Sequence, residues 1–138
     1  IDIAGDGSIQ MNIQELATAR QFKCPVKIAI LNNGYLGMVR QWQELFYENR
    51  LSGVDLEGNP DFVKLAEAYV IKALRIARPG DVDRKLKEAR AWNDEPVVDV
   101  AEVIKEDNVF PMIPAGGPVS PVIIERPKHR LEKPVGST

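Results

Sequence analysis

The chain has 138 residues, of which 44% are hydrophobic and 28% charged, and its formal net charge is −2. This length suits one globular domain, and the composition excludes a wholly disordered chain. The near-neutral charge leaves no electrostatic footprint for nucleic acid, and no apolar run reaches the roughly 20 residues that cross a bilayer.

The first part of the chain predicts a strand, a helix and a second strand. Residues 1–4 form a short alternating apolar run that ends at Gly5-Asp6-Gly7-Ser8, which is a turn signal. Apolar residues at helical spacing predict a helix within residues 11–22. The compact Val/Ile/Leu run at residues 25–31 is typical of a strand buried on both faces, and Asn32-Asn33-Gly34 ends it.

The middle of the chain predicts two helices separated by a loop. The helix over residues 35–47 has an apolar stripe, and the polar, glycine-containing segment 50–60 predicts a loop. Asn59 is typical of a helix N-cap and Pro60 of a first helical residue, so we expect a helix from there to Tyr69. The stripe consists of Tyr35, Met38, Val39, Trp42, Leu45 and Phe46.

The remaining pattern predicts strands at residues 71–76 and 97–103 with a helix at 82–92 between them. Strands and helices alternate at spacings too long for hairpins, which favours parallel strands joined by right-handed helical crossovers. The fold class is therefore α/β, with a mostly parallel sheet. Beyond Asp107 the Pro- and Gly-rich sequence predicts an irregular arm followed by a mobile tail.

Two of the predicted strands end in polar loops, one containing Asp6 and the other Asn33, 27 positions apart. Parallel strands that are neighbours place such loops at the same edge of a sheet, where α/β proteins bind ligands. A carboxylate and an amide oxygen favour Mg²⁺ or Ca²⁺ over zinc, and Gly7 lets a diphosphate approach the backbone. Either motif alone is most often a plain turn, but the pair indicates a Mg²⁺-diphosphate site.

This pairing resembles the thiamine diphosphate motif, in which Gly-Asp-Gly is followed one crossover later by Asn-Asn. The resemblance is closest to the large catalytic subunit of acetolactate synthase (acetohydroxyacid synthase), and four segments carry it: 5–16, 30–43, 59–68 and 108–112. It covers about residues 1–117, so we expect these to be the C-terminal portion of a thiamine diphosphate-binding domain. Residues 118–138 are then a divergent tail.

The resemblance implies a role for each matching residue. Asp6 and Asn33 would bind Mg²⁺ through their side chains, and Tyr35 would do so through its backbone carbonyl. Met38 and Trp42 would form a wall of the substrate site. The implied thiamine diphosphate-binding residues are Gly5, Asp6, Gly7, Ser8, Asn33, Tyr35, Gly37 and Met38.

The implied reaction decarboxylates pyruvate and joins the product to a second 2-keto acid, either pyruvate or 2-ketobutyrate, in branched-chain amino acid biosynthesis. The full enzyme would be a homo-oligomer with a regulatory subunit in some members. FAD and the glutamate that activates the cofactor would be held by domains outside this chain, so we expect no catalytic residue and no activity in the isolated chain. The open alternatives are a 2-keto acid decarboxylase, a pyruvate oxidase, or a non-catalytic remnant that binds a metal or a diphosphate.

Several single residues have plainer interpretations. The chain starts at Ile1 in a strand-like run without an initiator Met, which leads us to expect a piece of a longer protein. Cys24 is the sole cysteine; it suits a reducing, cytoplasmic compartment, and we expect it to be packed. Glu15 is typical of a solvated or capping residue, not a catalytic acid. Val70 and Ala73 stand where the family's pattern would place glycine.

Overall fold

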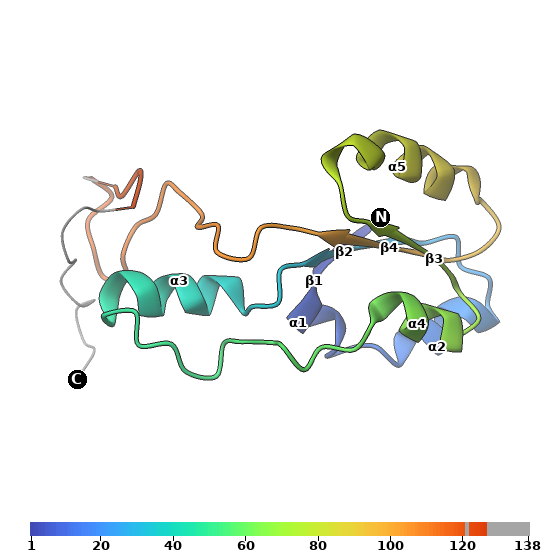
Figure 1. Ribbon diagram of the computed structural model, residues 1–138, viewed down its shortest axis with the longest axis horizontal. Coiled ribbons are helices and arrows are strands. Elements are labelled where there is room, and N and C mark those ends of the chain that lie inside the picture. Colours follow the sequence, from blue (N-terminus) through green and yellow to red (C-terminus); the bar gives the residue numbers. More distant parts are fainter. Residues whose placement is uncertain (121, 127–138) are drawn as a thin grey trace. The chain divides into compact units, whose positions relative to one another are not determined.

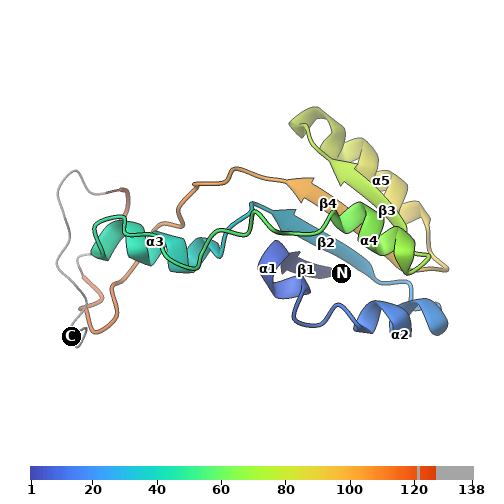
Figure 2. The same ribbon diagram turned by 60° about the horizontal axis from the view of Figure 1, so that its bottom comes forward.

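The computed structural model describes residues 1–120 and 122–126 (Figures 1 and 2). The chain forms two compact units, each treated by itself below. One combines Ile1–Gly34 with Leu56–Ile104, and the other combines Tyr35–Asp55 with the chain from Lys105 onward. Among the described residues, no helix has the length and apolar character needed to span a bilayer.

The first unit is built on a four-stranded sheet with the strand order β1-β2-β4-β3, and every neighbouring pair is parallel. The register places Ile3 beside Ala29, Ala29 beside Asp99 and Asp99 beside Leu74. The predicted parallel α/β class is confirmed, and each strand lies within about two residues of its predicted bounds. The strands are β1 (Asp2–Gly5), β2 (Lys27–Asn32), β3 (Lys72–Ile76) and β4 (Val97–Glu102).

Helices cover the two faces of this sheet unequally. Three lie on one face, namely α1 (Asp6–Ile9), α2 (Glu15–Gln21) and α4 (Phe62–Ala68), and α5 (Val82–Ala91) lies on the other (Figure 1). A short 3₁₀ turn, η1 (Pro79–Asp81), leads into α5. The main hydrophobic core fills the three-helix face, because alternate strand residues point there. Its buried members include Leu16, Ile28, Ile30, Phe62, Val98 and Val100.

Two predicted helices differ from the observed ones. The helix predicted within residues 11–22 is shorter, because the chain is already helical directly after β1 and then makes a turn before α2. The N-cap of α4 is Asp61 and not Asn59, since the Asp61 carboxylate accepts hydrogen bonds from the backbone of Val63 (3.0 Å) and Lys64 (3.3 Å). Asn59 has a different partner, described below.

Helix α3 (Gly37–Phe46) organises the second unit. Its buried face contains Arg40 and Gln41 along with two apolar residues, whereas Met38 and Val39 are about half exposed. The predicted apolar stripe is therefore only partly correct. Arg40 is buried because Glu44 pairs with its guanidinium at 2.8 Å. The apolar cluster of this unit is built around Leu45, Phe46 and Met112.

The arm that follows β4 is irregular, as predicted, with no helix or strand in its described residues. Gln41 fastens it to α3: its Oε1 accepts from the Val109 amide at 2.8 Å and its Nε2 donates to the Val109 carbonyl at 2.9 Å. Farther along, Met112 and Ile123 exchange two backbone hydrogen bonds. The predicted mobile tail lies partly outside the described residues, which omit 121 and 127–138.

The segment between α2 and β2 places Cys24 on the surface. Lys23 has a left-handed φ of 50°, and the Cys24 amide donates to the Ala19 carbonyl at 2.9 Å, which closes the end of the helix. The expectation of a packed thiol is therefore wrong. Glu15, by contrast, is exposed at the first turn of α2, where its charge favours the helix N-terminus.

Candidate functional site

The candidate site lies at the carboxyl ends of β1 and β2, which are neighbours in the sheet. Asp6 is the first residue of α1, directly after β1, and its side chain is only 1% exposed. Gly34 follows β2, and its φ of 69° lies in the left-handed region that glycine adopts without strain. Its amide donates to Asp6 Oδ2 at 2.8 Å, so the two predicted loops meet at this carboxylate.

A third segment also reaches Asp6. Asn59, in the loop before α4, donates from Nδ2 to Asp6 Oδ2 at 2.8 Å. Gln10 links these two residues, because its Nε2 donates to the Asp6 backbone carbonyl at 2.9 Å and to Asn59 Oδ1 at 2.8 Å. Sequence reasoning missed Asn59 as a site residue. The available signal was Asp61, a stronger cap two positions later, which leaves Asn59 for another partner.

The two oxygens of the Asp6 carboxylate are not equivalent. Oδ2 accepts two hydrogen bonds from outside its own helix, from Gly34 and Asn59. Oδ1 accepts the adjacent Gly7 amide, at 3.1 Å. Since a carboxylate oxygen has two lone-pair positions, Oδ1 keeps the capacity to bind a cation. The hydrogen bonds to Oδ2 fix the orientation in which Oδ1 is presented.

The Gly5–Ser8 turn is held by its own side chain. Ser8 Oγ accepts from the Gly5 amide at 2.9 Å and donates to the Gly5 carbonyl at 3.0 Å. A Cβ at Gly5 would meet only that hydroxyl oxygen, at 3.6 Å, so packing within this chain does not require glycine there. A glycine at this position suits close approach of a ligand to the backbone.

The donor set fits a hard divalent cation. Asp6 supplies a carboxylate oxygen, and Asn33, which is half-buried directly after β2, carries an amide oxygen. Oxygen ligands of this kind suit Mg²⁺ or Ca²⁺. Within the described residues there is no group of three or more His, Cys, Asp or Glu side chains that could hold a metal ion.

The other residues that the sequence singled out belong to the second unit. Tyr35 forms a backbone bridge with Asp55, and Lys105 Nζ lies 4.5 Å from the centre of the Tyr35 ring. Gly37 begins α3, and Met38 is 50% exposed. Trp42 packs on Phe46 with their ring centres 5.2 Å apart, as a core residue would.

A parallel sheet with an acidic and an amide-bearing loop at adjacent strand ends is typical of the α/β domains that bind a ligand at those ends. Residues 1–100 match the family described as thiamine pyrophosphate enzyme, C-terminal TPP binding domain. The chain belongs to this family, as its motifs predicted.

Within this family, the chain is similar to curated proteins named acetolactate synthase. The chain is 44% identical over 127 residues to the acetolactate synthase large subunit of Haemophilus influenzae, covering 92% of this chain and 22% of that protein. It is 52% identical over 118 residues to acetolactate synthase of Mycobacterium avium, covering 83% and 19%. The predicted similarity to this subunit is confirmed, and the chain spans about a fifth of the length of these relatives.

A solved structure shares the fold. The thiamine diphosphate-dependent 4-hydroxybenzoylformate decarboxylase of Rhodococcus jostii RHA1 matches with a TM-score of 0.67 and 33% sequence identity. The match covers 76% of this chain and 20% of the decarboxylase. The four-stranded parallel sheet with its helices is thus a fold found in a thiamine diphosphate enzyme.

Proposed function

We propose that this chain holds the metal-bound diphosphate of thiamine diphosphate. Asp6 and Asn33 bind Mg²⁺ through their side chains, and Tyr35 binds it through its backbone carbonyl. Gly7 and Ser8 contact the diphosphate, and Gly5, Gly37 and Met38 complete the cofactor-binding set. The observation that carries this proposal is the buried Asp6 carboxylate, whose Oδ1 keeps binding capacity beside the loop that contains Asn33.

The role of this chain's residues is to bind the metal ion and the diphosphate and to orient the cofactor. The Gly34 amide and the Asn59 side chain hold Asp6 Oδ2, so that Oδ1 has one fixed direction. Backbone N–H groups of the glycine turn offer donors to phosphate oxygens without a side chain in the way. The bound cofactor supplies the electron sink for decarboxylation, and the protein supplies its position and the surrounding charges.

For the whole protein we propose acetolactate synthase activity, a transferase reaction between pyruvate and a second 2-keto acid, pyruvate or 2-ketobutyrate. The identities of 43–52% to proteins of that name support it. On this proposal residues 1–117 complete the cofactor domain, and 118–138 are a separate tail. Met38 and Trp42 form the substrate-site wall. FAD, the activating glutamate, a homo-oligomeric partner and a regulatory subunit lie outside this chain, in a cytoplasmic enzyme.

A 2-keto acid decarboxylase is the second candidate, because a decarboxylase shares the fold at 33% identity. The two candidates differ in their product. A complete protein that contains this sequence should convert pyruvate to acetolactate. Acetaldehyde as the main product would replace the first candidate by the second. The isolated chain should form neither product, since it contains no catalytic residue on this proposal.

The cofactor proposal is tested on the 138-residue chain itself. Thiamine diphosphate with Mg²⁺ should raise the melting temperature, because a ligand that binds only the folded state stabilises it. Asp6→Ala should abolish this increase, whereas Asp2→Ala, which changes an exposed carboxylate on β1, should leave it intact. An unchanged melting temperature in the wild-type chain would contradict cofactor binding by this chain alone.

A further inference from the structure

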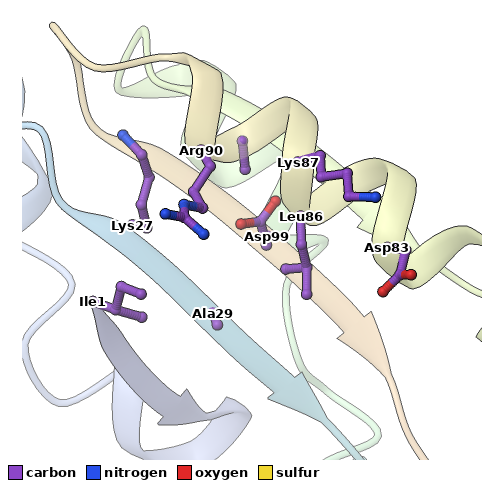
Figure 3. Close-up of a pocket in the computed structure, with 9 residues that line it drawn as sticks. Ile1, Lys27, Ala29, Asp83, Leu86, Lys87, Arg90 and Asp99 are labelled. Atoms are coloured by element: carbon purple, nitrogen blue, oxygen red, sulfur yellow. The ribbon is translucent and has the colours of Figure 1, made fainter.

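A hollow of about 260 Å³ lies in the first unit, between α5 and the strands β2 and β4 (Figure 3). It is on the opposite face of the sheet from α1, α2 and α4 (Figure 1). Its apolar lining comes from Ile1, Ala29, Leu86 and Ala89, and its polar groups include Asp99 and Arg90. The hollow is separate from the site at Asp6, because that site lies at the carboxyl ends of β1 and β2.

The Asp99 side chain has a carboxylate oxygen that needs a hydrogen-bond donor. The residue is on β4, its exposure is 3%, and its Oδ1 has no hydrogen-bond partner in the part of the chain that the structure describes. Figure 3 shows the carboxylate directed away from the strand, toward α5 and the hollow. A buried oxygen without a donor costs free energy comparable to a lost hydrogen bond. A ligand in the hollow that carries a donor would remove that cost.

The charges around Asp99 select the kind of donor. Lys27, Lys87 and Arg90 line the hollow as cations, and Asp83 and Asp99 line it as acids. Lys27 Nζ is engaged elsewhere, since it donates to the Trp92 and Glu95 carbonyls beyond the end of α5. An amine in the hollow would face these cations, and a carboxylate would face Asp99. A neutral donor avoids both repulsions.

We propose that this hollow binds a small neutral molecule with a primary carboxamide on a short, branched apolar body. The amide N–H donates to Asp99 Oδ1, which is the orphaned acceptor. The amide oxygen accepts from the Arg90 guanidinium, which also lines the hollow. The apolar body packs on Ala29, Leu86 and Ala89, where it shields the carboxylate from water.

Three molecules of matched shape test this chemistry at pH 7.5: isobutyramide, isobutyrate and isobutylamine. Titrated into the ¹⁵N-labelled 138-residue chain, isobutyramide should shift the amide resonances of Ala29, Asp99 and α5 and saturate in the millimolar range, as its size allows. The acid and the amine should need at least about tenfold higher concentrations, since each loses one hydrogen bond and meets a like charge. Equal responses to all three, or no saturable response to the amide, would overturn the proposal.

Substitutions in the lining of the hollow test which side chains bind isobutyramide. Asp99→Leu should abolish the isobutyramide response, whereas Asp99→Asn should keep it, because the Asn side chain still presents an acceptor oxygen. Arg90→Leu, at an exposed position, should weaken binding about tenfold. Arg84→Leu on the same helix is the matched control and should change nothing. Undiminished isobutyramide binding by Arg90→Leu would show that another group binds the amide oxygen. Resonance shifts that depend on protein concentration but not on isobutyramide concentration would show that a second copy of the chain occupies the hollow.

Discussion

The Asn59 side chain and the Asp6 carboxylate are joined by a hydrogen bond of 2.8 Å across 53 positions of sequence. The same carboxylate oxygen also accepts the Gly34 amide, so three chain segments converge on one buried acid. Because Asn59 uses its Nδ2 on Asp6 and its Oδ1 on Gln10, both ends of its amide are occupied. Asn59 is therefore a positioning residue for Asp6.

Asn59→Leu keeps the side-chain size and removes both hydrogen bonds. We expect the free energy of unfolding to fall by about 1–2 kcal/mol, since Asp6 Oδ2 then loses one of its two donors. Binding of Mg²⁺ with thiamine diphosphate should weaken severalfold, because Oδ1 is no longer held in place. Urea unfolding and calorimetric titration measure the two effects. Asn93→Leu, at an exposed position, is the control; equal behaviour of the two variants would contradict this role.

The charge of Asp99 should make stability depend on pH. Burial raises the pKa of this carboxyl to about 6; Lys27 and Lys85 oppose the increase and Glu88 adds to it. Because the unfolded chain releases the proton near pH 4, the folded chain holds more protons between about pH 4 and 6. The contribution of Asp99 to the free energy of unfolding is full below that window and falls by up to about 3 kcal/mol as the pH rises through it.

Asp99→Asn isolates this effect, since it cannot ionise. The difference in unfolding free energy between the variant and the wild type should grow in favour of the variant from pH 4 to pH 6 and stay constant above. Asp83→Asn, an exposed neighbour on α5, should follow the wild-type profile. Parallel profiles for Asp99→Asn and the wild type would show that the carboxyl has an ordinary pKa.

Gln41 should control the opening of the arm after β4. Gln41→Leu removes both hydrogen bonds to Val109 and leaves the Val109 amide and carbonyl without these partners. We expect amide hydrogen exchange at Val109 to accelerate at least about tenfold and the unfolding free energy to fall by about 2 kcal/mol. Gln43→Leu on the same helix loses exposed bonds to Ser52 and should leave Val109 protected. Fast amide exchange at Val109 in both variants would show that Gln41 has no specific role in holding the arm.

The position of Val70 predicts a stabilising substitution. Val70 has a φ of 59°, which is unfavourable for a β-branched residue, and its side chain is 67% exposed. Val70→Gly should therefore raise the unfolding free energy by about 1 kcal/mol. Ala73→Gly in β3 should lower it by a similar amount, because glycine weakens a strand. A loss of stability in Val70→Gly would mean that contacts of the valine outweigh its backbone strain.

The sequence predicted the features that depend on local pattern and on parallel topology. The strands have short Val/Ile/Leu runs, and placing Asp6 and Asn33 at one sheet edge required only that their strands be parallel neighbours. What escaped prediction depends on distant partners. Arg40 and Gln41 are polar yet buried, because Glu44 and Val109 satisfy them. Asn59 matches a cap in isolation, and only the folded chain shows that Asp6 takes its side chain.

The surface position of Cys24 has a practical consequence. It is the chain's single cysteine, and it precedes the amino end of β2, whereas Asn33 follows the carboxyl end of the same strand. A maleimide fluorophore would attach there in a one-to-one ratio, about 20 Å of strand away from the loops proposed to bind the cofactor. Air oxidation, by contrast, would link two molecules covalently, so samples for light scattering need a reductant.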